Sequence, residues 1–166
     1  MSQLAVNTPK GQDSLKREER SVEILNNYHP GLFYAGTPKD SAAIIDAVLI
    51  TPSGTQSLAV CGIAEQKSRW MSYQKLKDWD FEWLITNEKL QKSQKIAEDL
   101  CVPLFGLLYL IPDDCLLFEK FWEKGKWNVE YEVRHTETWE TTENKNKIFR
   151  DNAFVKMGKA EVLKGT

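Results

Sequence analysis

Apolar runs bounded by turn residues define most of the secondary structure that the chain predicts. Residues 12–28 repeat apolar side chains at helical spacing, which predicts an amphipathic helix. Residues 44–50 and 58–67 are two apolar runs, and the sequence Thr-Pro-Ser-Gly-Thr between them is typical of a turn. We therefore expect these two runs to be the arms of an antiparallel hairpin.

The remaining pattern mixes both element types along the chain. The further expected elements are a short strand over 32–35, a short helix over 71–79, a strand over 81–86, a helix over 88–101 capped by Asn87, a buried strand over 103–111, an edge strand over 115–122 and a half-exposed strand over 127–139. This order predicts an α/β (α+β) fold. We expect a central mixed sheet of about four to six strands flanked by helices, with a C-terminal β extension.

Length and composition limit the organisation and the class of the protein. The 166 residues suit one domain, which we expect over 12–140, after a flexible N-terminal tail over 1–11 and before an extension over 141–166 packed on the same domain. Hydrophobic residues make up 42% and charged residues 28%, as in ordinary globular proteins. The net charge of -2 provides no global positive field, so binding to a polyanion would need a local patch.

Cysteine usage and hydropathy indicate a cytoplasmic protein. The three cysteines form no C-x-x-C pair and lie in apolar sequence, so we expect buried, reduced thiols. The N-terminus has no signal-sequence pattern, and no apolar run approaches the roughly 20 residues of a membrane span. Two isolated histidines argue against a histidine-rich zinc site.

Three charged residues interrupt or end the two hairpin arms. Asp46 lies inside the first apolar run, where a lone carboxylate is costly to bury unless it is paired, hydrogen-bonded or bound to a metal. Glu65 and Lys67 are spaced by one residue, which puts their side chains on the same face of a strand. Pairing of the arms can bring Asp46 beside them and so offer oxygen ligands to Mg²⁺. The alternative is that the strand reaches the surface at Glu65 and that both of its charges are solvated.

The same residues resemble the PD-(D/E)XK nuclease superfamily. The likeness consists of Asp46, then Glu65-Gln66-Lys67 on a second apolar strand, all preceded by a helix that carries Glu19. It covers about residues 12–111 and departs from the nominal motif at Ile45, where the motif has proline.

The resemblance implies a restriction-endonuclease-like core of helix, antiparallel strands, helix and strand. It also implies a Mg²⁺- or Mn²⁺-dependent phosphodiesterase that acts on DNA. Asp46 and Glu65 would hold the metal, and Lys67 would serve the attacking water. Glu19 would match an acid on the first helix, with Glu18 and Glu23 as alternatives in register.

A second lysine and a small group of surface residues complete the candidate site. Many nucleases of this superfamily carry a lysine or glutamine on the helix after this strand, and Lys89 is the best match, with Lys92 or Gln91 as alternatives. A solvated lysine on a lysine-rich face is the competing interpretation of Lys89. Arg69, Trp70 and Lys92 are the candidate nucleic-acid contacts, since an exposed tryptophan can stack on a base.

The resulting hypothesis is a metal-dependent nuclease that hydrolyses DNA phosphodiester bonds. The first alternative is a catalytically inactive nucleic-acid-binding or protein-interaction module on the same fold, and the second is a nucleotide phosphohydrolase. We expect nucleic acid, most simply DNA, as the partner, and no membrane. The small size favours low sequence specificity, a homo-oligomer, or a partner protein that supplies specificity.

Overall fold

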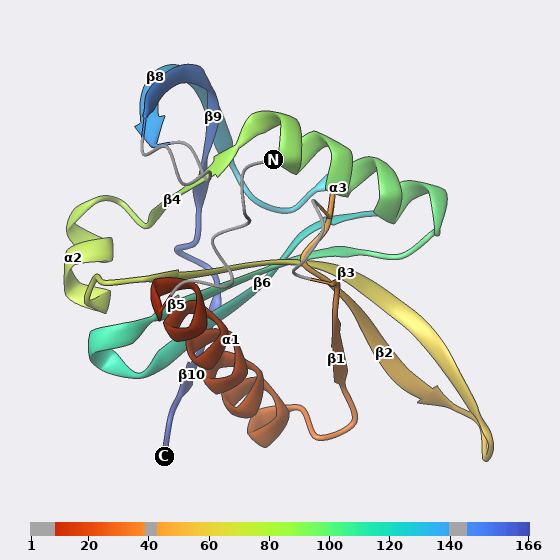
Figure 1. The fold of residues 1–166 in the computed structure, drawn as a ribbon. Coiled ribbons are helices and arrows are strands. Elements are labelled where there is room, and N and C mark those ends of the chain that lie inside the picture. Colours follow the sequence, from red (N-terminus) through yellow and green to blue (C-terminus); the bar gives the residue numbers. More distant parts are fainter. Residues whose placement is uncertain (1–8, 39–42, 140–145) are drawn as a thin grey trace.

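Two sheets and three α-helices make up the described part of the chain, which comprises residues 9–38, 43–139 and 146–166 of a computed structural model (Figure 1). The elements in order are α1 (Pro9–Tyr28), β1 (Phe33–Gly36), β2 (Ala47–Ser53), β3 (Ser57–Arg69), α2 (Tyr73–Asp78), β4 (Glu82–Thr86), α3 (Asn87–Asp99), β5 (Leu104–Leu110), the 3₁₀ turn η2 (Ile111–Asp113), β6 (Cys115–Glu123), β7 (Lys126–Trp127), β8 (Tyr131–Trp139), β9 (Lys147–Lys156) and β10 (Glu161–Lys164). The predicted α+β class is therefore confirmed.

The larger sheet is mixed. Its strand order is β1-β2-β3-β5-β6-β10, and the short β7 adds to β6 to make seven strands. All neighbours run antiparallel except β3 and β5, which are parallel and are joined by a crossover through α2, β4 and α3. Parallel neighbours require such a crossover, since a tight hairpin can join only antiparallel strands.

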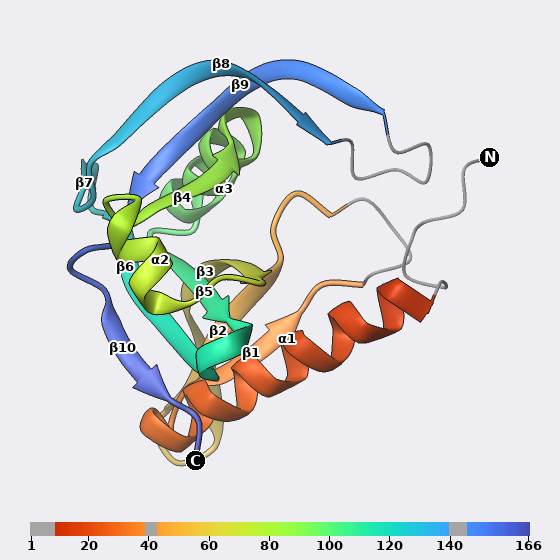
Figure 2. The same ribbon diagram turned by 90° about the vertical axis from the view of Figure 1, so that its left-hand side faces the viewer.

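The helices cover opposite faces of this sheet. Ile24 and Leu25 of α1 are fully buried against one face, in a cluster that includes Leu49 of β2. Leu90 and Ala97 of α3 are buried against the other face, in a cluster that also contains strand residues of the three-stranded sheet β4-β9-β8. Figure 2 shows α3 lying between the large sheet and the curved β8–β9 ribbon, with α1 on the far side of the sheet.

Several boundaries differ from the sequence-based expectations. The first helix begins at Pro9, so Pro9 to Gly11 are helical and not part of a tail, and residues 1–8 lie outside the described residues. The larger sheet has seven strands where four to six were expected. Strand β6 is not an edge strand, because β10 from the far end of the chain pairs with it, with Leu163 opposite Leu116. Asn87 is the first residue of α3, and Thr86 occupies the N-cap position without a side-chain bond.

The C-terminal segment contributes one strand to each sheet, β9 to the smaller and β10 to the larger. The expectation of buried cysteines holds only for Cys115, since Cys61 is half-buried and Cys101 is exposed, and all three thiols are free. Within the described residues, no helix is both long and apolar enough to cross a membrane.

Candidate metal centre

Asp46 lies at the start of the hairpin, one residue before β2 and not inside it as expected. The backbone N–H of Thr37 donates to the Asp46 carbonyl at 2.9 Å, which ties this residue to the end of β1. The backbone N–H of Gln66 donates to Oδ2 of Asp46 at 2.9 Å. The backbone of the neighbouring strand β3 thus orients the Asp46 carboxylate at the start of β2.

Glu65 lies directly across from Asp46 on β3. The register pairs Ala47 with Ala64, so the residues one step further along, Asp46 and Glu65, are neighbours on the face that α3 covers. The Glu65 side chain is only 3% exposed, and its Oε1 accepts a hydrogen bond from Ser93 Oγ on α3.

One lysine joins the two carboxylates. Lys89 Nζ lies 2.7 Å from Oδ1 of Asp46 and 2.9 Å from Oε2 of Glu65. These two carboxylate oxygens therefore cannot lie farther apart than the sum of those two distances. Lys89 and Ser93 are four residues apart on α3, which puts both on the same side of the helix and opposite Glu65.

The two carboxyl groups of the cluster have pKa values shifted in opposite directions. Burial raises the pKa of Glu65 to about 8, and the negative charge of Asp46 acts in the same direction. Burial also opposes ionisation of Asp46, but Lys89 and the N–H of Gln66 outweigh it and lower the pKa of Asp46. Desolvation disfavours the charge of Lys89, and the two carboxylates together overcome it and raise the pKa of Lys89. Near neutral pH, Asp46 and Lys89 are charged and Glu65 is largely protonated.

A divalent cation fits this cluster by charge and by donor type. With Glu65 ionised, two carboxylates would face one ammonium group and one negative charge would be uncompensated, which adds to the effect of burial in raising the pKa of Glu65. Mg²⁺ and Mn²⁺ take oxygen ligands, often one or two carboxylates completed by water and phosphate. Among the described residues, no group of three or more His, Cys, Asp or Glu side chains is arranged to hold a metal ion, so the protein would supply these two carboxylates.

Lys67 lies on the same face of β3 as Glu65, two residues further along. It is exposed, and it forms no ion pair with any other residue of the described ranges. Desolvation by the surrounding protein, followed by the positive charges of Arg69 and Lys89, lowers the pKa of Lys67. Because solvent reaches this side chain, the lowered pKa of Lys67 indicates only that its neutral amine forms more readily than that of an ordinary lysine.

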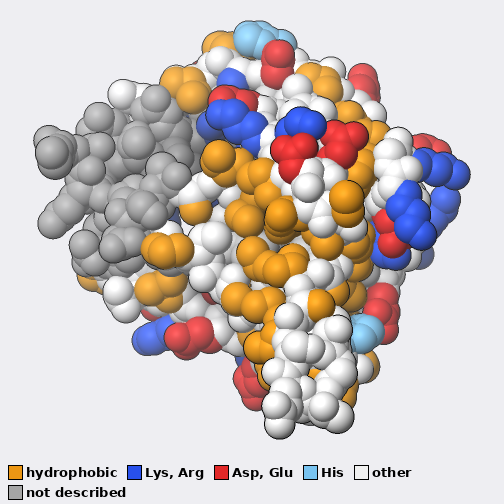
Figure 3. All heavy atoms as spheres, turned by 90° about the vertical axis from the view of Figure 1, so that its right-hand side faces the viewer, with side chains coloured by type: hydrophobic (Ala, Val, Ile, Leu, Met, Phe, Trp, Pro, Cys, Tyr) orange, Lys and Arg blue, Asp and Glu red, His pale blue; other side chains and the backbone are white. Residues whose placement is uncertain are grey.

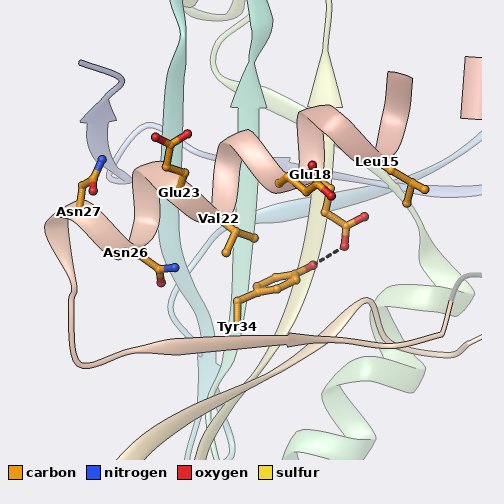
Figure 4. A pocket seen from close by; sticks show the side chains of 8 residues that line it. Leu15, Glu18, Val22, Glu23, Asn26, Asn27 and Tyr34 are labelled. Atoms are coloured by element: carbon orange, nitrogen blue, oxygen red, sulfur yellow. Dashed lines mark hydrogen bonds between the residues drawn. The ribbon is translucent and has the colours of Figure 1, made fainter. Parts of the chain in front are cut away.

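The acid on α1 that approaches this region is Glu18. Its Oε1 accepts a hydrogen bond of 3.0 Å from the Tyr34 hydroxyl on β1 (Figure 4). Desolvation and the charges of Glu18 and Asp46 raise the pKa of Tyr34, which indicates that this hydroxyl lies within the field of the cluster. Glu19 is exposed and lines the outer groove between α1 and β1, and Glu23 pairs with Arg20 at 2.7 Å.

The candidate nucleic-acid contacts lie in different settings. Trp70 is 71% exposed just beyond β3, with the Arg17 guanidinium of α1 5.3 Å from its ring centre. Arg69 is half-buried, and desolvation lowers its pKa. Lys92 pairs with Glu88 at 2.6 Å on the exposed side of α3, and within the described ranges it has no ion pair with Asp46 or Glu65. Of the alternatives to Lys89, Gln91 instead donates to the Tyr131 hydroxyl on β8.

No significant match to this chain was found among protein-family models, curated proteins or solved structures. No relative therefore supplies an activity or a substrate. The function has to be inferred from the chemistry of the site itself.

Two residues that hold the cluster in place were missed from the sequence. Ser93 occupies a position of the apolar stripe of α3, and a polar residue there, four after Lys89, was the available signal. Gln66, the middle residue of the Glu-Gln-Lys motif, binds Asp46 through its N–H and donates from its side chain to Ser21 Oγ on α1 at 2.6 Å. Nothing in the sequence pairs Gln66 with Ser21, because the contact crosses from the sheet to a helix 45 residues away.

Proposed function

We propose that the protein is a metal-dependent nuclease that hydrolyses DNA phosphodiester bonds, with Asp46 and Glu65 as the metal ligands. The observation that carries the proposal is that both carboxylates contact one ammonium group. Lys89 Nζ lies 2.7 Å from Asp46 Oδ1 and 2.9 Å from Glu65 Oε2, and Lys67 lies on the same face of β3 as Glu65. A buried acid with a strongly raised pKa beside a second carboxylate is more typical of a functional site than of a structural ion pair.

The order of elements supports the finer assignment to a restriction-endonuclease-like core. Helix α1 is followed by the antiparallel strands β1, β2 and β3 and then, after the inserted α2 and β4, by α3 and by β5, which runs parallel to β3. This is the order that the resemblance to the PD-(D/E)XK superfamily implies. The acidic and basic residues of the motif lie where β2 begins and β3 approaches α3.

The residues of the chain divide the chemistry among them. A divalent ion held by Asp46 and Glu65 would neutralise negative charge on the scissile phosphate and act as a Lewis acid. Lys67, exposed and with a lowered pKa, can accept a proton from the attacking water or donate hydrogen bonds to the phosphate. Lys89 compensates the carboxylates when no other cation is present, and Ser93 fixes the orientation of Glu65.

A nucleic-acid substrate suits the residues beside the cluster better than a nucleotide does. Arg69 ends β3 two residues after Lys67, and Trp70 follows it, with the Arg17 guanidinium of α1 beside its ring. Cations bind the phosphate backbone and an exposed indole ring stacks on a base, so the combination favours a polymer that reaches past the site of cleavage.

The test is a cleavage assay with purified protein on linear, nicked, single-stranded and supercoiled DNA, in Mg²⁺ or Mn²⁺. We expect cleavage by the wild type and its loss in EDTA. Asp46→Ala and Lys67→Ala should each lower the rate by at least about 100-fold. Lys95→Ala is the matched control, because Lys95 pairs with Asp99 at 2.8 Å on the exposed side of α3 and is not a candidate contact, and it should retain the wild-type rate.

Three other results would each reject the proposal. Cleavage that persists in both Asp46→Ala and Lys67→Ala would indicate a contaminating nuclease. Salt-sensitive DNA binding without cleavage in either metal would indicate an inactive binding module on this fold. Release of phosphate from nucleotides without loss of DNA would indicate a phosphohydrolase.

A further inference from the structure

The face of the β2–β3 hairpin that points away from α1 is apolar and exposed. Register pairs Phe33 of β1 with Ile50 of β2, and Ile50 with Val60 of β3, so these three side chains form one row across three strands. Leu58 lies opposite Pro52 on the same face, one pair nearer the tip of the hairpin. Phe33 is 51% exposed, Val60 44% and Leu58 68%.

This face is exposed because neither α1 nor α3 covers it. On the opposite face, Ala47 and Leu49 are fully buried in the cluster that α1 covers. On the near face, the cluster around α3 extends along the hairpin only to Ile63 and the partly buried Val48. Figure 3 shows hydrophobic side chains gathered on this side of the molecule, above the uncharged tip of the hairpin.

The part of the hairpin from Ala47 to Ala64 is also free of charge. The 18 residues from Ala47 to Ala64 contain no Asp, Glu, Lys, Arg or His, although 28% of the chain is charged and a segment of this length would carry about five charges at that rate. Natural proteins usually place charges on exposed strands next to a sheet edge, since apolar strands there associate. β1, which borders this face, is an edge strand of the larger sheet.

We infer that this hairpin face is the interface through which the protein forms a homodimer, with the face of one copy packed on the same face of a second copy. The inference is independent of the proposed nuclease activity. A twofold axis brings an uncharged surface onto itself, so self-association creates no like-charge contacts between the 47–64 segments of the two copies. A nucleic acid or a strongly charged protein would find no complementary charge on it.

The size of the face is consistent with a second copy. Phe33, Leu58 and Val60 expose roughly 280 Å² if a large apolar side chain has about 170 Å². A standard interface buries about 800 Å² per partner, of which the apolar centre is a part and a polar rim supplies the rest. The Ser and Thr residues of the hairpin tip are suited to that rim.

The test is sedimentation velocity between about 5 and 200 µM, with two matched variants. Val60 and Val162 are both strand valines of similar exposure, 44% and 37%, but Val162 lies on β10 at the opposite edge of the larger sheet. We expect the wild type and Val162→Lys to reach twice the chain mass of 19.1 kDa and Val60→Lys to remain a monomer. Leu58→Lys, near the hairpin tip and 68% exposed, serves as a second disrupting variant should Val60→Lys not fold.

Each of the other outcomes overturns the inference. A wild type that stays at 19.1 kDa up to 200 µM does not use this face for a second copy. A dimer that persists in folded Leu58→Lys and Val60→Lys forms elsewhere on the molecule. A monomer that dimerises only after residues 1–8 are deleted would show that the N-terminal segment of the same chain covers the face.

Discussion

Replacing Glu65 with glutamine should stabilise the protein at and above neutral pH. The side chain is 3% exposed and its pKa is raised to about 8 from an ordinary 4.5. An acid with a raised folded-state pKa binds its proton more tightly in the folded protein. Folding is therefore unaffected by this group below about pH 4.5, and stability is lost as pH rises from there to about 8.

The size of the effect follows from the shift. One pKa unit corresponds to 1.36 kcal/mol, so at pH 7 the ionisation of Glu65 in the unfolded chain costs about 3 kcal/mol of stability at most. Relaxation and water entry reduce such values, and we expect Glu65→Gln to gain about 1 to 3 kcal/mol between pH 5 and pH 8 relative to wild type. The glutamine amide keeps the shape of the protonated acid and can still accept from Ser93.

The assay is urea unfolding followed by tryptophan fluorescence at pH 5, 6.5 and 8, with EDTA to exclude metal. Glu130→Gln is the matched control, because Glu130 is exposed ahead of β8, and its stability should stay within about 0.5 kcal/mol of wild type at each pH. The reasoning is refuted if Glu65→Gln destabilises the protein equally at pH 5 and pH 8. That result would mean that Glu65 is ionised throughout and held as a structural ion pair with Lys89.

Three further predictions test other parts of the structure. Ser93→Ala leaves a buried Glu65 oxygen without its donor and should lower cleavage about tenfold, whereas Ser93→Thr, which keeps the hydroxyl, should retain more activity in the same assay. Glu119→Gln should stabilise the protein by on the order of 1 kcal/mol at pH 8.5 and not at pH 4. The reason is that desolvation raises the pKa of Glu119 to about 7, and one of its buried oxygens has no partner in the described structure. Equal urea midpoints of wild type and Glu119→Gln at pH 8.5 would contradict this. Gly106→Ala should cost about 3 kcal/mol in urea unfolding, since the new methyl group would overlap the buried Phe121 ring, while Gly31→Ala, with no described atom within 4 Å of the new methyl group, should be neutral.

The hairpin and its charged residues were predictable because local signals agreed there. The turn sequence, the two apolar arms and the parity of the strands are enough to bring Asp46 opposite Glu65, as the register has them. Lys89 could be proposed because the resemblance implies a lysine or glutamine on the helix after the motif strand, and Lys89 lies in the first turn of α3. The pairing of Asp46 with Glu65 depends only on periodicity within two adjacent strands.

The remaining features depend on contacts between distant segments. The position of β6 inside the sheet requires β10, which is added from the C-terminal end of the chain. The choice between Glu18 and Glu19 depends on the rotation of α1 relative to β1, which a single residue of register changes by about 100°. Tryptophans illustrate the same limit, because Trp83 is buried whereas Trp79, four residues earlier, is 54% exposed.

The central claim is that Asp46 and Glu65 form the metal site of a nuclease, and single-turnover cleavage of a labelled DNA oligonucleotide against Mn²⁺ concentration tests it most directly. We predict a rate that saturates with Mn²⁺ for the wild type and falls at least about 100-fold for Glu65→Gln, a variant whose folding the urea experiments establish independently. Equal, Mn²⁺-dependent cleavage by wild type and Glu65→Gln would contradict the account.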